Sequence, residues 1–211
     1  MPRVTTELGL RERKKQRMRQ LIADTARRLF AERGFEAVPV AEIAREAEVS
    51  EATVFNYFPT KEDLVFHRME AFEDELLDAI RERGEDESIV EAFGRFVLRP
   101  RGFLGSDDPE ATEGMRRVAW VMTGSQALQA REREILDRYT STVAALIAEE
   151  RGMSAGDPEP WVMANALIGL HRALVSYTHR QALDGVPNRR IARNVVTHGK
   201  RALAILEDGI E

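Results

Sequence analysis

The chain has 211 residues, of which 43% are apolar and 32% charged, a length that suits one large or two small domains. Glycine (14) and proline (8) are too few for a loop-rich or collagen-like chain, and strong helix formers fill most of the sequence. The absence of cysteine excludes disulfide scaffolds, metal sites held by cysteine and thiol nucleophiles. Composition therefore predicts an all-α protein.

The charge is unevenly distributed. The net charge is −5, yet residues 1–20 hold seven basic side chains against two acidic ones, while residues 63–211 are acidic overall. A basic end on an acidic body is typical of a protein that meets a polyanion, although a charge run alone also fits a solvated tail.

No segment has the pattern of a membrane or export element. Residues 1–20 lack the apolar stretch of a secretory signal, and the apolar run Val162–Leu170 is far too short to span a bilayer. We expect a cytoplasmic protein without a membrane partner.

In chain order, the first predicted helix has an apolar stripe from Met18 to Phe30 and ends at Gly34. A left-handed residue at Gly34 would let Phe35 fold back on Phe30. A short second helix over 40–47 follows, with one apolar face.

Ser50 is expected to cap a third short helix that ends before Pro59. Thr60 to Asp63 then has the pattern of a capping box at the start of a long fourth helix, whose apolar stripe reaches Ile80.

Five further helices complete a predicted total of about nine. Two of them open with an aspartate followed by proline, a pattern typical of a helix N-terminus. The fifth lies near 89–97, the sixth runs from Asp108 to about Gly124, the seventh ends near Gly152, the eighth runs from Asp157 to Gly185, and the ninth runs from Pro187 to about Gly209.

The eighth predicted helix is apolar nearly all round, so both of its sides must be covered. A second copy of the chain is one cover, and a central position in a monomeric bundle is the other. For the first case we predict an interface on the last two helices, formed by Leu167, Leu170, Leu174, Val195, Ala202 and Leu206.

Residues 38–62 carry two short helices joined by a tight turn, the arrangement of a helix-turn-helix. The outward side of the second helix offers short polar and aromatic groups suited to base edges and phosphates. Glu51 on that helix either faces solvent or accepts from a cytosine amino group.

A specific resemblance extends this pattern. The runs Ala26–Phe30 and Ile43–Ser50, and above all Thr53–Lys61 with Tyr57-Phe58-Pro59-Thr60-Lys61, make residues 11–72 similar to the DNA-binding domain of TetR-type regulators.

The resemblance implies a homodimeric transcriptional regulator, a repressor that a small-molecule inducer releases from a palindromic operator in double-stranded DNA. Residues 1–64 would form the DNA-binding domain, with the helix-turn-helix near 39–58, and residues 65–211 the ligand-binding and dimerisation domain. The implied DNA-binding residues are Arg13, Lys14, Arg17, Val40, Ser50, Thr53, Phe55, Asn56, Tyr57 and Lys61.

Three positions depart from the family pattern. Pro39 stands where a threonine usually precedes the second helix, and Phe55 replaces a tyrosine. Glu48 replaces the glycine of the turn, so it would have to adopt a left-handed conformation.

Polar or aromatic side chains on apolar faces of the body are candidates for an inducer site, and they suggest a mostly apolar or aromatic ligand. They are Phe93, Phe96, Trp120, Tyr139 and His171. For His171, a core position satisfied by a backbone carbonyl is the alternative.

The sequence lacks the common nucleotide-binding, hydrolase and zinc-protease motifs, and its four histidines are scattered. We therefore expect no enzyme activity, no cofactor and no metal. Two alternatives remain open, a helical interaction protein with a degenerate DNA-binding surface and a helical enzyme with an unrecognised site.

Overall fold

The computed structural model describes residues 9–67, 69–106, 108–154 and 156–210, and it divides into two compact units, Met1–Arg68 and Met69–Glu211. The described residues form ten α-helices and one short 3-10 helix, with no strand among them, which confirms the all-α prediction. The division predicted from the sequence falls after residue 64.

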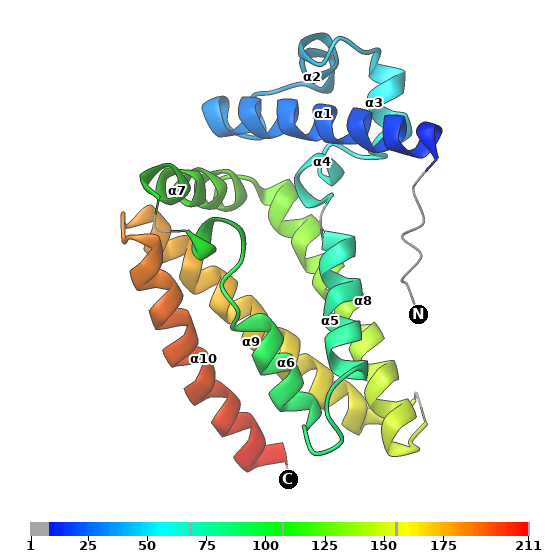
Figure 1. Ribbon diagram of the computed structural model, residues 1–211, viewed down its shortest axis with the longest axis vertical. Helices are drawn as coiled ribbons and strands as arrows, with labels where there is room; N and C mark the ends of the chain where they lie inside the picture. Colours follow the sequence, from blue (N-terminus) through cyan, green and yellow to red (C-terminus); the bar gives the residue numbers. More distant parts are fainter. Residues whose placement is uncertain (1–8, 68, 107, 155, 211) are drawn as a thin grey trace, which may run out of the picture. The chain divides into compact units, whose positions relative to one another are not determined.

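Unit 1 consists of a long first helix and three short ones. They are α1 (Leu10–Arg33), α2 (Val40–Glu46), α3 (Glu51–Tyr57) and α4 (Asp63–Phe66), with α2 and α3 together on one side of α1 (Figure 1). Its core contains Ile22, Leu29, Phe30, Phe35, Val38, Ile43, Val54, Phe58 and Leu64, all almost fully buried. Apolar side chains from all four helices thus meet in one small core.

The end of α1 behaves nearly as predicted. Gly34 has a positive φ of 83°, and the rings of Phe30 and Phe35 lie 5.0 Å apart. Its ψ of 161° is extended rather than left-handed helical, a combination that only glycine adopts readily. Glycine at 34 is therefore required by the backbone, and the predicted left-handed helical conformation was wrong in ψ.

The predicted fourth helix is in fact two helices, α4 and α5 (Met69–Arg81). The capping box at its start is present, because Thr60 and Asp63 each accept from the other's backbone N–H with their side chains. The break follows at His67, whose Nδ1 donates to the Leu64 carbonyl (3.1 Å). That carbonyl is the one that a continuing helix would use four residues later, so the side chain competes with helix propagation.

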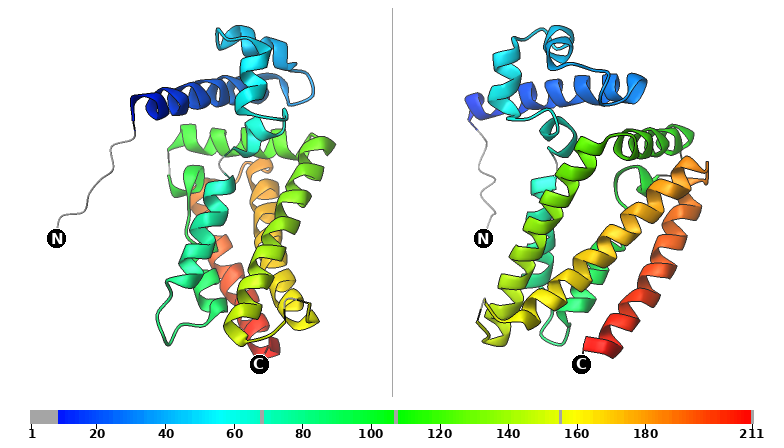
Figure 2. Two further views of the ribbon diagram at one scale, coloured as in Figure 1. Left: turned by 90° about the vertical axis from the view of Figure 1, so that its right-hand side faces the viewer. Right: turned by 180° about the vertical axis from the view of Figure 1, so that it is seen from behind.

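Unit 2 is a helical bundle, and α9 runs along the face that the right-hand view of Figure 2 shows. Besides α5, its elements are α6 (Ile89–Val97), η1 (Gly102–Gly105), α7 (Pro109–Thr123), α8 (Gln126–Arg151), α9 (Pro158–Leu183) and α10 (Asn188–Ile210). Helix α9 contacts α6, α7, α8 and α10 of its own chain. The continuous apolar surface of α9 is therefore covered largely within one chain.

Local sequence patterns fix the starts of α7 and α9, but by different contacts. Asp108 caps α7 by accepting from the Glu110 backbone (2.9 Å), as predicted. Asp157 stands at the same position before α9, yet its carboxylate turns back to accept from the Ser154 backbone (2.8 Å). The aspartate–proline pair marks both boundaries, although only one side chain serves as a helix cap.

The turn between α2 and α3 is a Schellman motif built on glutamate. The Val49 N–H donates to the Ala44 carbonyl (2.9 Å), and the Glu48 N–H donates to the Arg45 carbonyl (3.2 Å). Glu48 has a φ of 55° and is the only residue other than glycine with a positive φ in the part of the chain that the structure describes. The predicted strain at this position is confirmed.

Replacing Glu48 by glycine should stabilise unit 1 by about 1 kcal/mol, because glycine adopts a left-handed conformation without a steric penalty. Both tryptophans lie in unit 2, so amide hydrogen exchange at Val54 and Phe58 is the suitable measurement. The control Glu46→Gly changes the last residue of α2 and also removes its contact with Arg28, so it should instead destabilise unit 1, by about 1 kcal/mol from the helical preference alone. Faster exchange in Glu48→Gly than in the wild type would contradict the assignment.

Candidate DNA-binding surface and ligand pocket

Ser50 caps α3 as predicted. Its Oγ accepts from the Thr53 backbone N–H (3.1 Å) and lies 2.8 Å from the Thr53 hydroxyl oxygen. The two hydroxyl groups are therefore hydrogen-bonded to each other at the start of α3. Thr53 is half-buried.

The remaining outward side of α3 is open. Asn56 is exposed, Phe55 exposes 46% of its surface and Tyr57 is half-buried, whereas Val54 faces the core with 1% exposed. The structure thus gathers the side chains that the sequence assigned to DNA contact on one accessible side of a short helix. Val40 is half-buried at the start of α2, where Pro39 provides no side-chain cap.

The acidic residues of α2 are paired with arginines of α1. Arg33 contacts Glu42 (2.6 Å), and Arg28 contacts Glu46 (3.2 Å). Pairing of this kind offsets the negative charge that the sequence places in the helix-turn-helix. Glu48 and Glu51 are exposed.

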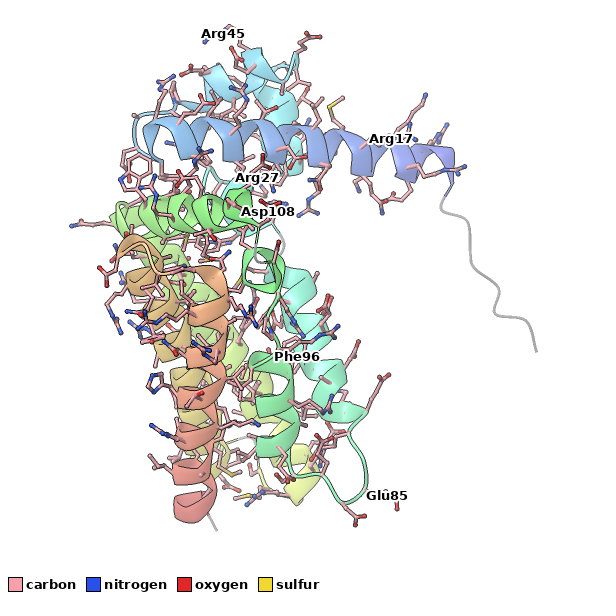
Figure 3. All side chains as sticks on the ribbon, turned by 60° about the vertical axis from the view of Figure 1, so that its left-hand side comes forward. Arg17, Arg27, Arg45, Glu85, Phe96 and Asp108 are labelled. Atoms are coloured by element: carbon pink, nitrogen blue, oxygen red, sulfur yellow. The ribbon has the colours of Figure 1, made fainter. Side chains whose placement is uncertain are left out.

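The N-terminal half of α1 carries basic side chains of a different kind. Arg13, Lys14 and Arg17 are exposed, and none of them forms an ion pair with another described residue. Figure 3 shows Arg17 on the turns of α1 that project beyond α2 and α3. All three residues lie on α1. Positive charge near the N-terminus of a helix is unfavourable by itself and favourable beside an anion.

The ammonium group of Lys61 makes one hydrogen bond inside unit 1. Its Nζ donates to the Phe35 carbonyl (2.6 Å) and lies 4.2 Å from the centre of the Phe35 ring. Burial lowers the pKa of Lys61, while Glu36 and Glu62 oppose this effect. An ammonium group has three donors, so this bond leaves others for a phosphate.

The aromatic residues predicted to bind a ligand fall into two environments. Phe93 and Tyr139 are completely buried and Phe96 is 6% exposed, while Trp120 is 44% exposed. Phe96, Tyr139 and His171 surround a residue that the sequence analysis missed, Phe72, at ring-centre distances of 5.2, 6.1 and 5.1 Å. Phe93, Phe96, Tyr139 and His171 thus pack in the core of unit 2, where neighbouring side chains fill the space around them.

Arg101 completes this cluster. Its guanidinium lies 3.7 Å from the centre of the Phe96 ring, and it approaches Glu75 at 3.5 Å. Desolvation, and to a smaller extent the charge of Arg101, lower the pKa of His171 to about 4. His171 is surrounded closely by protein atoms, although part of its surface stays accessible. Because its pKa is about 4, the imidazole is neutral at neutral pH.

A pocket of about 250 Å³ lies elsewhere in unit 2, between α7, α8 and α9. Its lining contains none of the five predicted ligand residues, and it consists of Met122, Thr123, Gln129, Glu132, Arg133, Leu136, Arg172, Ser176, His179 and Arg180. One lining residue, Arg172, stands out in the sequence as a basic side chain within the most apolar helix. The sequence analysis considered mainly aromatic residues and did not assign Arg172 to the ligand site.

Within the described ranges, no three histidine or acidic side chains come together as metal ligands would. No described helix combines the length and hydropathy that a bilayer crossing needs.

Comparison with known proteins assigns both units. Residues 22–67 match the profile of the bacterial regulatory proteins of the tetR family, and residues 88–188 match the MftR C-terminal domain. Together these two matches cover more than half of the chain. The chain belongs to the TetR family.

Relatives and structures agree with this assignment. TcmR, a transcriptional regulator of Streptomyces glaucescens, is 26% identical over 151 residues, which cover 71% of this chain and 67% of TcmR. MftR of Mycobacterium tuberculosis is 27% identical over 165 residues, 75% of this chain and 77% of MftR. The structure of NalD from Pseudomonas aeruginosa, a repressor of an efflux pump, matches 89% of this chain and 97% of its own with a TM-score of 0.57 and 17% identity.

The protein is therefore a DNA-binding transcriptional regulator, and the family assignment favours this function over an enzyme. TetR regulators bind DNA, dimerise and bind ligands through the C-terminal domain. The two short helices and the turn at Glu48 are the helix-turn-helix of this family, with α3 in the position of the recognition helix.

The low pKa of His171 predicts a pH-dependent stability. In the unfolded chain a histidine titrates near pH 6.5, so between pH 6.5 and about 4 the unfolded state binds more protons. The free energy of unfolding should therefore fall as the pH falls through this range, by about 3 kcal/mol in total for this group. Substituting His171→Phe should remove this part of the pH dependence.

Urea unfolding at pH 6.5, 5.5 and 4.5, followed by tryptophan fluorescence, measures the effect in unit 2. The exposed His198, changed to glutamine, is the matched control and should keep the wild-type pH dependence. An unchanged pH dependence in His171→Phe would show that His171 is not the neutral core group described above.

Proposed function

We propose that this regulator is a repressor that binds a palindromic operator as a homodimer and leaves it when a small-molecule inducer binds unit 2. The observation that carries the proposal is the combination in unit 1 of an open α3 with unpaired basic residues on α1. An inverted repeat follows from the proposed dimer, because two-fold symmetry presents the same helix to two half-sites.

The DNA contacts divide by chemistry. Asn56 is exposed on α3 and has the amide group that pairs with adenine in the major groove, so we assign it to base contact together with Thr53. Phe55 and Tyr57 lie against the DNA backbone in this assignment. Lys61 and the basic residues of α1 contact phosphates, with Lys61 using the donors that the Phe35 carbonyl leaves free.

A selection from randomised duplex DNA at about 150 mM salt tests the proposal. We expect one enriched inverted repeat, since phosphate contacts alone provide no sequence preference. Weak binding without an enriched sequence would contradict the proposal and favour the alternative of an interaction protein with a degenerate DNA-binding surface.

The double variant Arg13→Gln/Arg17→Gln separates phosphate from base contacts. It should bind the selected duplex more weakly with the same sequence preference, and the slope of log K against log salt should fall by about one per lost contact. Arg27→Gln is the control, because Arg27 is held by Asp24 at 2.7 Å on the same helix. Equal salt slopes in all three proteins would remove Arg13 and Arg17 from the interface.

We propose a dimer surface that keeps Ala202 from the predicted set and differs in other residues. Leu167, Leu170, Leu174 and Val195 expose at most 9% of their surface within a single chain, so they cannot form an outer surface. Their apolar character is explained by contacts of α9 and α10 inside the bundle. Ala202 and Leu206 remain half-exposed.

We assign the interface to the outer sides of α9 and α10. Gly169 and Ala173 are exposed on α9, and a Cβ added at Gly169 would meet no atom within 4 Å. On α10, Ile205 is 71% exposed beside the half-exposed Ala202. Small side chains on α9 and an exposed isoleucine on α10 suit the close approach of two helix pairs.

Gly169→Arg should convert the dimer to a monomer and weaken operator binding at least about tenfold, because the new side chain occupies the interface. Analytical ultracentrifugation measures the first effect and fluorescence anisotropy the second. In an isolated chain the same change should raise stability by about 0.5–1 kcal/mol, since arginine favours helix over glycine.

Gly84→Arg is the matched control. Gly84 is exposed in the loop between α5 and α6, also with no atom within 4 Å of an added Cβ, and its φ is not positive. This variant should remain a dimer. A Gly169→Arg protein that also remains dimeric would place the interface elsewhere.

A further inference from the structure

The pocket between α7, α8 and α9 contains charged side chains without close partners. Glu132, Arg133, Arg172 and Arg180 line it, and none of the four forms a hydrogen bond or an ion pair with another residue that the structure describes. Glu132 feels the charges of Arg172 and Arg133 only through longer-range attraction.

Some arginines of unit 2 outside the pocket have carboxylate partners. Arg83 contacts Glu150 at 2.6 Å, and Arg95 contacts Glu87 at 2.8 Å. In the pocket, Glu132 is half-buried and partly desolvated without a close partner, which is costly for a charge, while Arg133, Arg172 and Arg180 are exposed around it. A bound molecule that reaches both Glu132 and the arginines would supply such a partner.

The pocket is positive overall. Burial raises the pKa of Glu132 and lowers the pKa of His179, so both groups are shifted toward their neutral forms. Three guanidinium groups stay charged, because arginine does not lose its proton in proteins.

Neutral polar groups in the lining offer further hydrogen bonds that can orient a ligand. The amide of Gln129 donates to the Thr123 carbonyl (2.9 Å), which leaves its oxygen as an acceptor, and Ser176 adds a hydroxyl. Met122 and Leu136 provide the apolar part of the lining. A volume of about 250 Å³ lies just below the range of drug-sized pockets, so the ligand is small.

We propose that this pocket binds a small organic acid, whose carboxylate is held by Arg172 and Arg180 and whose hydroxyl or amino group donates to Glu132. Arginine is suited to this task, because its planar group matches a carboxylate with two parallel hydrogen bonds. The chemistry differs from the apolar or aromatic ligand that the sequence suggested. The regulatory part rests on the proposed function, in that the acid acts as the inducer.

Calorimetric titration of the full chain with acetate, succinate, 4-hydroxybenzoate and inorganic phosphate tests the binding. At least one carboxylate should bind with a Kd below about 1 mM, and its uncharged amide should bind at least about tenfold more weakly. If phosphate binds as well as every carboxylate, or if no carboxylate reaches that affinity, the proposal is overturned.

Substitutions locate the site. Arg172→Met/Arg180→Met should weaken carboxylate binding at least about tenfold, while Arg189→Met/Arg190→Met, on the exposed start of α10, should leave it unchanged. Circular dichroism checks that both proteins fold. Glu132→Gln keeps the shape of the side chain and removes its negative charge, so it should bind the carboxylate at least as tightly as the wild type. Equal loss in both arginine pairs would overturn the site.

Fluorescence anisotropy with the selected operator separates this proposal from the proposed function. The bound carboxylate should release the wild-type protein from DNA, and Arg172→Met/Arg180→Met should bind DNA normally but fail to respond. If the carboxylate binds but does not release the protein from DNA, the inducer role is overturned, whereas the binding site itself is supported. Absence of specific DNA binding in every variant would instead be a failure of the proposed function.

Discussion

The position of α3 after α2 depends on one strained residue. Because Glu48 adopts a left-handed conformation, the chain turns sharply after α2, and α3 begins at Glu51, seven residues after Ala44, whose carbonyl closes the turn. The helices α8 and α9 end with the same motif at Gly152 and Gly185. Two of the three turns therefore use the residue that the geometry favours, and the functional turn does not. Strain of this kind is common at functional sites, where the surrounding packing over-determines the backbone.

The arginines of α1 differ in their partners along the helix. Toward its C-terminal end, Arg28 and Arg33 are paired with the carboxylates of α2, which ties the two helices together and hides negative charge from a polyanion. Toward its N-terminal end, Arg13 and Arg17 have no partner among the described residues. One helix thus separates a structural set of arginines from a set available for binding. The net charge of the whole chain, which is negative, conceals this division.

Features set by neighbours in sequence were predictable. The cap at Ser50, the positive φ at Gly34 and the strain at Glu48 each depend on a turn of a few residues, and the structure contains all three. The split after α4 was missed because it depends on one side-chain bond of His67, which the apolar stripe through this region does not reveal. The family motif identified the fold of unit 1 for the same reason, since its residues lie close together along the chain.

Features set by tertiary packing were not predictable in the same way. An apolar residue on α9 has the same appearance in the sequence whether its own chain or a second copy covers it, and Leu167 and Leu174, which the sequence analysis placed at an interface, are buried within a single chain. The exposed residues of α9 form one stripe, on which Gly169 and Ala173 lie within a helical turn of Arg172 and Ser176 of the pocket. In our assignment, ligand and second subunit therefore act on the same helix. A ligand that repositions Arg172 has a rigid connection to the subunit interface, which is the physical requirement for coupling the two events.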